Sequence, residues 1–323
     1  YNSYKKGPPD SVDVFVLDAL YISAFAEKQW ILPIDQAEIQ KAADILPHAL
    51  EGCLYQGQYF GIPQFGCANI LYYRKADTAI ANCTNLQTLY DLLGDANYTG
   101  PFPPKGLDSF LLVDLSSGTS DVCWYLEAAM DRSGVYSTHP KLVSPDSLDP
   151  EALDNVKKLV AMGGKTQSRE WLPERAAAFS TDVGRSYIGF TENMSTMEAL
   201  DNIAIKLVPS YTQSDLDLFF MDAAVINATL KNNPEKKKLA MALINLIAST
   251  AHMAQSCQNG DQAFYYMPAR KSIFEQLDQK YPTYKAMWQL IETSEPKTFR
   301  LGPEAFDQLN SDYKDQVEAR IFE

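Results

Sequence analysis

The chain has 323 residues, of which 46% are apolar and 21% are charged, and its formal net charge at pH 7 is −13. A chain of this length usually divides into more than one hydrophobic core, so we expect two domains. The acidic balance argues against a nucleic-acid partner, because phosphate recognition needs basic patches. No apolar stretch reaches the roughly 18 residues of a membrane-spanning helix, so no membrane partner is expected either.

A short buried strand is predicted at residues 12–17 (VDVFVL), and it ends at the carboxylate of Asp18. The carboxyl ends of strands in open α/β sheets face the ligand crevice, which makes Asp18 a candidate binding residue. The same side chain could instead cap the helix expected at residues 19–29. A helical apolar pattern at residues 33–50 follows.

Residues 61–75, GIPQFGCANILYYRK, form the most distinctive stretch of the chain. A glycine and a proline at its start predict a turn, and Gly66 permits a tight bend or a close approach to another group. A strand-favouring run follows at residues 70–73. Cys67 therefore stands at the entrance of a predicted strand, where its thiol can face a cleft. The alternative is an ordinary buried cysteine, which is the commoner situation.

Two more carboxylates follow predicted strands. Glu192 comes after the short strand at residues 185–190, and Asp222 comes after another at residues 216–220. Taken alone, Glu192 could also be an acid at the start of a helix at residues 194–200, where negative charge is favourable.

The clearest helix is predicted at residues 233–249, with Asn233 as its cap. Its expected inward-facing residues are Leu239, Leu243, Leu246 and Ile247. The other expected elements are helices at residues 86–93, 149–163, 273–280 and 284–293, a strand at 106–115, and loops at 100–106 and 260–270. Strands that alternate with helices in this way predict an α/β protein.

The motifs of several enzyme classes are absent. The sequence contains no GxxxxGK[ST], GxGxxG, GxSxG or HExxH motif. Its three histidines, at positions 48, 139 and 252, do not adjoin a nucleophile, so a histidine-based triad is not expected. No cysteine pair forms CxxC, so we expect no metal. A cysteine nucleophile with a carboxylate base remains. The cysteines expected in the core or in disulfides are Cys53, Cys83, Cys123 and Cys257.

Five segments together resemble the thiaminase I (thiamine pyridinylase) family. They are DVFVLDA (13–19), GIPQFGCANILYYRK (61–75), GRSYIGFTENM (184–194), FFMD (219–222) and FRLGPE (299–304). The block GIPQxxCxNxLxYRK is the most specific of them, because related solute-binding proteins share its GIP and LYY but not its cysteine. The resemblance implies an α/β fold like that of type II periplasmic binding proteins, with two lobes, hinge crossovers and an interdomain cleft.

The lobes implied by this resemblance are discontinuous in sequence. The N-terminal lobe would comprise residues 1–73 and 223–297, and the C-terminal lobe residues 74–222 and 298–323. The first strand–helix–strand unit of the family would precede Tyr1, so we expect it to be missing from this sequence.

The family replaces the thiazole of thiamine by an amine or thiol nucleophile through a covalent Cys–pyrimidine intermediate. Matched by position, Cys67 is the nucleophile and Glu192 the base that activates it, while Asp18 and Asp222 hold the aminopyrimidine. A base is needed because a thiol with a pKa of about 8.5 is only slightly ionised at neutral pH. The carboxylates also suit an amino group and a cationic thiazolium. No cofactor is implied.

The sequence departs from the family at aromatic positions. Phe190 and Phe220 stand where the family has substrate-contacting tyrosines, so each keeps a ring but loses a hydroxyl. A further tyrosine, expected around Pro173, has no clear counterpart. We retain Phe190 and Phe220 as substrate-binding candidates.

The implied partners are thiamine and a small nucleophilic co-substrate, namely pyridine, an aromatic amine or a thiol. We expect a secreted monomer. Secretion is also hinted at by the glycosylation sequons at Asn82, Asn97, Asn193 and Asn227. The alternative hypothesis is a non-catalytic solute-binding protein for thiamine or a related pyrimidine, in which Cys67 would have no chemical role.

Overall fold

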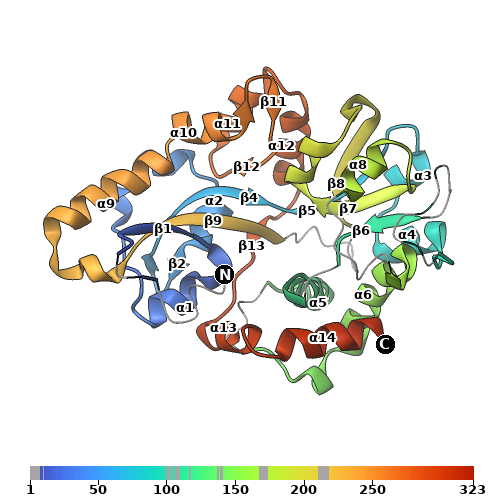
Figure 1. Ribbon diagram of the computed structural model, residues 1–323, viewed down its shortest axis with the longest axis horizontal. Coiled ribbons are helices and arrows are strands. Elements are labelled where there is room, and N and C mark those ends of the chain that lie inside the picture. The colour runs from blue at the N-terminus through green and yellow to red at the C-terminus, as the bar shows by residue number, and fades with distance from the viewer. Residues whose placement is uncertain are drawn as a thin grey trace.

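Figure 1 shows the protein as a computed structural model, which describes residues 8–9, 11–98, 100, 103, 105, 110–115, 118–136, 138, 141–166, 174–209 and 218–323. The strands are β1 (Val14–Asp18), β2 (Leu54–Tyr55), β3 (Gln58–Tyr59), β4 (Ile62–Cys67), β5 (Asn69–Arg74), β6 (Leu111–Val113), β7 (Ser186–Phe190), β8 (Ile203–Leu207), β9 (Leu218–Ile226), β10 (Gln258–Asn259), β11 (Gln262–Ala263), β12 (Met267–Pro268) and β13 (Lys297–Thr298). The α-helices are α1 (Ile22–Glu27), α2 (Pro47–Gly52), α3 (Thr78–Ala81), α4 (Leu86–Leu93), α5 (Gly118–Ser133), α6 (Pro150–Gly163), α8 (Arg175–Ser180), α9 (Pro234–Ile247), α10 (Thr250–Ser256), α11 (Lys271–Asp278), α12 (Thr283–Thr293), α13 (Pro303–Leu309) and α14 (Tyr313–Phe322). Single 3-10 turns include η2 (Ala19–Tyr21), η3 (Gln36–Glu38), η4 (Ala42–Asp44) and η6 (Thr191–Thr196).

The main strands form two separate sheets. In the first sheet the order is β1-β9-β4-β12, and β13 runs parallel to β9. In the second sheet the order is β6-β7-β5-β8. The first sheet lies at the left of Figure 1 with α9, and the second lies at the right with α3, α4 and α8. The α/β class predicted from the sequence is thus confirmed.

The chain changes sheet beside the predicted nucleophile. Cys67 is the last residue of β4 in the first sheet, and Asn69 is the first residue of β5 in the second. The chain is back in the first sheet by Leu218, where β9 begins. The positions at which the chain changes sheet are not the predicted lobe limits at residues 73 and 222. The predicted limits come from sequence motifs, whereas the sheets are defined by hydrogen-bond pairing. The lobe limits themselves remain a prediction.

Gly66 lets β4 lie close against β9. A Cβ atom at Gly66 would stand 2.5 Å from the carbonyl oxygen of Phe220 and 2.7 Å from Cε of Met221. The register of the two strands also shifts between Pro63 and Gly66, and such bulges commonly redirect a neighbouring side chain. Cys67 follows directly and lies opposite Phe220. The close approach expected at this glycine therefore determines where the thiol lies.

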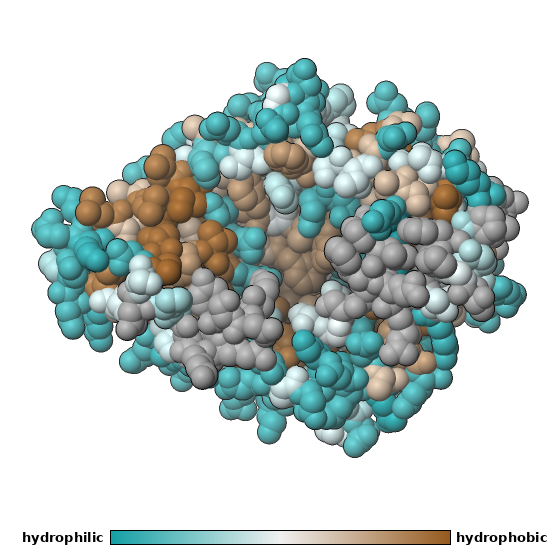
Figure 2. Space-filling model, viewed as in Figure 1, coloured by the Kyte–Doolittle hydropathy of each residue, from teal (hydrophilic) through white to brown (hydrophobic). Residues whose placement is uncertain are grey.

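The helix predicted at residues 233–249 is present as α9, but its predicted inner face is wrong for the three leucines, and only Ile247 packs partly buried against the core. Its start is as expected, because Asn233 accepts a hydrogen bond from the backbone N–H of Lys236 and a proline occupies the first turn. The buried residues are Ala240, Met241, Ile244 and Asn245, whereas Leu239, Leu243 and Leu246 are 71%, 45% and 64% exposed. Figure 2 shows the resulting apolar patch at its left. Apolar residues on both sides of this helix make its periodicity ambiguous.

Turns replace two predicted helices. The helical pattern at residues 33–50 becomes η3, η4 and the short α2, because Lys41 takes a left-handed conformation with a φ of 50° that a helix cannot contain. The helix expected at residues 194–200 is replaced by η6, which ends at the extended backbone of Met197. In both places a local conformation overrides the apolar pattern.

The C-terminal segment spans both sheets. β13 pairs with β9 in the first sheet, α13 packs against α1, and α14 packs against α5 and α6 next to the second sheet. Figure 1 shows this red segment running below the middle of the molecule. Across the described part of the chain, no helix is both long enough and apolar enough to cross a membrane.

Candidate active site

Four predicted site residues share one face of the first sheet. In the antiparallel pairs, Cys67 lies opposite Phe220, and Asp222 lies opposite Asp18. Facing residues project to the same side of a sheet, as do residues two apart on one strand. The thiol, the Phe220 ring and both carboxylates therefore point to the same side.

Glu192 approaches this face from the second sheet. β7 ends at Phe190, which pairs with Asn69 just beyond Cys67, and η6 begins immediately afterwards and carries Glu192 in its first turn. The hydroxyl of Tyr72 donates a hydrogen bond of 2.8 Å to the carbonyl oxygen of Phe190, which holds this strand end in place. Oε2 of Glu192 is buried and has no hydrogen-bond partner among the described residues.

The charged groups of the site influence one another. Burial raises the pKa of the Cys67 thiol well above its ordinary value, and the negative charges of Glu192, Asp18 and Asp222 raise it further. Burial also raises the pKa of Glu192 to about 7, and Asp222 adds to this shift. The pKa of Asp222 is itself raised by loss of surrounding water, although its side chain is accessible from the pocket. A carboxyl group with a pKa near 7 can take up or release a proton at physiological pH.

Two phenylalanines form an aromatic contact between the sheets. The ring centroids of Phe190 and Phe220 are 5.8 Å apart, with an interplanar angle of 88°. Phe299, which is fully buried, packs behind Phe220 with a distance of 5.7 Å between the ring centroids. Rings in this arrangement offer apolar faces and edges to a flat heteroaromatic ligand. Figure 2 shows a recessed, largely apolar area near the middle of the molecule.

A pocket of about 190 Å³ opens beside the two aspartates. It is lined by Val16, Leu17, Asp18, Tyr21, Phe25, Asp222, Phe306 and Asn310. Oδ1 of Asp18 also accepts a hydrogen bond of 2.9 Å from the backbone N–H of Leu20, so this residue both caps η2 and lines the pocket. The capping interpretation of Asp18 therefore holds, and its role in binding a ligand remains a prediction.

Sequence reasoning missed the aromatic and amide walls of this pocket. Tyr21 and Phe25 follow Asp18 by three and seven positions, the spacing of residues on one face of a helix. This spacing is the one local pattern from which both residues could have been predicted. Phe306 and Asn310 come from the other end of the chain, and nothing in their local sequence separates them from ordinary core and surface residues.

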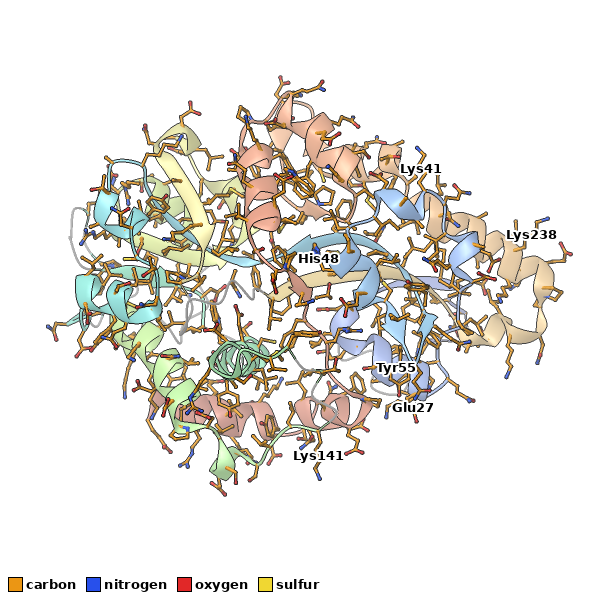
Figure 3. The ribbon with its side chains drawn as sticks, turned by 180° about the vertical axis from the view of Figure 1, so that it is seen from behind. Glu27, Lys41, His48, Tyr55, Lys141 and Lys238 are labelled. Atoms are coloured by element: carbon orange, nitrogen blue, oxygen red, sulfur yellow. The ribbon has the colours of Figure 1, made fainter. Side chains whose placement is uncertain are left out.

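The described histidines do not pair with the thiol. The ring of His48, on α2, lies 5.1 Å from that of Phe219, which projects to the side of β9 opposite to the one that faces Cys67. Burial lowers the pKa of His48 to about 4, so its ring is neutral. Figure 3 shows His48 near the middle of the molecule, seen from behind. His252 is exposed on α10, and His139 lies outside the described residues, as does Pro173.

All five cysteines are free, and four of them are buried. The buried ones are Cys53, Cys83, Cys123 and Cys257, so they belong to the core rather than to disulfides. Cys67 is partly exposed as a residue, although burial is the main cause of the raised pKa of its thiol. Within the described ranges, no group of three or more histidine, cysteine or acidic side chains could hold a metal ion.

Comparison with known proteins gives consistent matches. A family profile described as the thiaminase-1 domain matches residues 68–210. Thiaminase-1 of Paenibacillus thiaminolyticus is 33% identical over 314 residues, which cover 94% of this chain and 75% of that relative. The solved structure of Clostridium botulinum thiaminase I in complex with thiamin has a TM-score of 0.93 and 32% identity, and the match covers 99% of this chain and 89% of that one.

A more distant match concerns the fold alone. An ABC transporter solute-binding protein from Thermotoga lettingae has a TM-score of 0.64 at 16% identity, and the match covers 96% of this chain and 79% of that one. The predicted fold, like that of type II periplasmic binding proteins, is confirmed. By its identity and coverage with respect to the Paenibacillus enzyme, the chain belongs to the thiaminase-1 family.

Proposed function

We propose that this protein is a thiamine pyridinylase, an enzyme that degrades thiamine by transferring its pyrimidinylmethyl group to another nucleophile. Membership of the thiaminase-1 family supports the reaction class. The observation that supports the proposal in this chain is that Glu192, whose pKa is about 7, follows the strand end that pairs with Asn69, two positions after the free thiol of Cys67. The charge of Glu192 also raises the pKa of that thiol. The proposed nucleophile thus ends β4 of the first sheet, and the proposed base follows β7 of the second sheet.

The proposed reaction begins with attack by sulfur. As the Sγ atom of Cys67 bonds to C6 of the pyrimidine, its proton passes to Glu192 and the displaced ring electrons move to the pyrimidine nitrogens. These electrons then return and break the bond between the bridging methylene carbon and the thiazolium nitrogen, so the thiazole leaves as a neutral molecule with the electron pair. The ring remains attached to sulfur.

The second half of the proposed reaction releases the pyrimidine from the sulfur. A pyridine, aromatic amine or thiol forms a bond to the methylene carbon, and the ring electrons expel the sulfur, which recovers its proton from Glu192. Pyridine remains as a pyridinium, whereas an amine or thiol releases its own proton to solvent. A general base with a pKa near the working pH serves both halves, because it can accept and return the proton with little energetic cost.

The remaining site residues would position the substrate. Asp18 and Asp222 would accept hydrogen bonds from the amino group of the pyrimidine, and their charge would attract the thiazolium cation. The rings of Phe190 and Phe220 would contact the heterocycle, which in this chain receives no phenolic hydrogen bond from these two positions.

Incubation with thiamine and aniline tests the proposal. We expect loss of thiamine and appearance of free thiazole, measured by liquid chromatography. Cys67→Ser should lose turnover but still bind thiamine. Intact-mass analysis with a halogenated aminopyrimidine should find one adduct, on the peptide that contains Cys67. Unchanged thiamine in a preparation that binds it would favour a solute-binding protein, and normal turnover by Cys67→Ser would exclude the covalent mechanism.

We also propose that the protein is a secreted monomer. Of the four sequons, Asn82 and Asn97 are exposed, whereas Asn227 is buried and donates hydrogen bonds to the carbonyl oxygens of Pro9 and Val12. Modification is therefore expected at Asn82 or Asn97 but not at Asn227. Peptide mass analysis of the protein recovered from culture medium, with light scattering for its mass in solution, tests these statements.

A further inference from the structure

The pocket beside the aspartates lies on the side of the site away from the thiol. Across the first sheet the strand order is β4, β9, β1, so Cys67, Asp222 and Asp18 succeed one another in that direction. Beyond them the pocket continues to Tyr21 and Phe306. Neither Cys67 nor Glu192 lines it, so it is separate from the residues that would perform the chemistry.

The geometry of the substrate ring determines what enters this pocket. If C6 of the pyrimidine faces Cys67, the opposite ring atom is N3, which lies between C2 and C4. The amino group at C4 and the methyl group at C2 therefore both point away from the sulfur, in the direction of the aspartates. The amino group is the hydrogen-bond donor that the carboxylates can bind, which leaves the C2 substituent to face the other walls.

Those walls suit an apolar group. The ring centroids of Tyr21 and Phe306 are 5.3 Å apart at 82°, and those of Phe25 and Phe306 are 5.8 Å apart at 86°. Val16 adds an aliphatic side chain that is 46% exposed, on the same face of the sheet as Asp18. A carbon substituent placed here would be surrounded by aromatic edges and a branched alkyl group, which favours its transfer from water.

We propose that this pocket is a specificity subsite that receives the C2 substituent of the pyrimidine and accepts alkyl groups larger than methyl. The proposal rests on the proposed function. The pocket volume is about 190 Å³. One water molecule occupies about 30 Å³ of the liquid, and a methyl group has a similar volume, so the pocket is several times larger than a methyl group. Even with the ring edge inside, the pocket has room for further carbon atoms.

The test compares thiamine analogues that carry hydrogen, methyl, ethyl or propyl at C2 of the pyrimidine. For the unmodified protein, kcat/KM for the propyl analogue should be within about tenfold of that for thiamine, because the pocket has room for the added carbons. A pocket closed around a methyl group would instead discriminate by about 10- to 200-fold for each added methylene. Val16→Phe fills the pocket from an exposed strand position and should lower the propyl-to-methyl ratio by about 100-fold. Val143→Phe is the matched control, since Val143 is 49% exposed and does not line the pocket.

The outcomes separate this inference from the function on which it rests. Turnover of thiamine with the same propyl-to-methyl ratio in the unmodified protein and Val16→Phe would overturn the subsite and leave the enzyme. A more than 1,000-fold loss for the propyl analogue in the unmodified protein would also overturn it. If thiamine is not turned over at all, the proposed function fails. Dissociation constants of the four analogues are then compared, and a higher propyl-to-methyl ratio of dissociation constants in Val16→Phe than in the unmodified protein would still support the subsite.

Discussion

Replacing Glu192 by glutamine should make the protein more stable and inactive at the same time. In the folded protein, burial raises the pKa of Glu192 from the ordinary 4.5 to about 7. The folded state therefore holds this proton more tightly than the unfolded chain does. Its stabilising effect is complete below about pH 4.5 and is lost as the pH rises through about 7.

The size of the effect follows from the two pKa values. They differ by about 2.5, and each unit corresponds to 1.36 kcal/mol, which gives about 3 kcal/mol for a fully buried group. Because the side chain keeps partial contact with solvent, we expect about 2–3 kcal/mol. Glutamine resembles the protonated acid in shape and is neutral at every pH, so Glu192→Gln should be more stable than the unmodified protein by this amount at pH 8.5 and equally stable at pH 4.5.

Urea denaturation of both proteins at several pH values is the assay. The difference in free energy of unfolding should grow between about pH 4.5 and pH 7 and then level off. Turnover of thiamine by Glu192→Gln should fall by about 100-fold or more, the loss typical of a missing general base. Equal stability of the two proteins at pH 8.5 would refute the inference that burial of this carboxylate is costly, and a normal rate would refute its role as base.

Three further predictions concern packing and charge. Gly66→Ala brings a Cβ to 2.5 Å from a backbone oxygen of β9, so it should cost about 1–3 kcal/mol in urea denaturation and lower kcat by displacing Cys67. Ile244→Ala, at a fully buried position, should cost about 2–5 kcal/mol, whereas Leu243→Ala, at a position 45% exposed, should change stability by less than about 0.5 kcal/mol. Equal losses would mean that the exposed face of α9 is covered in solution. In Cys67→Ser, calorimetry should find that thiamine binds more tightly as the pH rises through about 7, because ionised Glu192 attracts the cation, and a pH-independent affinity would contradict this.

Much of the fold could be predicted where local chemistry decides it. The caps are visible in the sequence: Asp149 accepts hydrogen bonds from two backbone N–H groups at the start of α6, and Asn233 caps α9. Strands β1 and β5 are short runs of β-branched and aromatic residues. The inner face of α9 could not be predicted, because leucines outside and a methionine and an isoleucine inside give the helix two apolar stripes.

The candidate site was predictable only in part, since it is made by contacts between distant segments. Cys67 and Glu192 are separated by 125 positions, and their adjacency depends on β5 pairing with β7. The resemblance to a family identified both residues, whereas the local pattern at Glu192 equally fitted the start of a helix. The resemblance did not identify Phe306 and Asn310. These two residues line the same pocket as Asp18 because the C-terminal segment returns to the first sheet.

In the proposed mechanism, burial keeps the thiol of the empty site unreactive. Burial and mutual repulsion hold the Cys67 thiol protonated and keep the Glu192 pKa near neutral. A bound thiazolium cation would stabilise the ionised forms of Cys67 and Glu192. It would therefore lower the pKa of both groups and assist removal of the thiol proton. By linkage, the ionised site binds the cation more tightly by the same factor. Once the thiazole has left as a neutral molecule, no cation lowers these pKa values. When the second product forms and Cys67 is expelled from the ring, reprotonation of its sulfur would therefore be favourable again. In the proposed mechanism, the charge of the substrate would thus couple binding, activation and release.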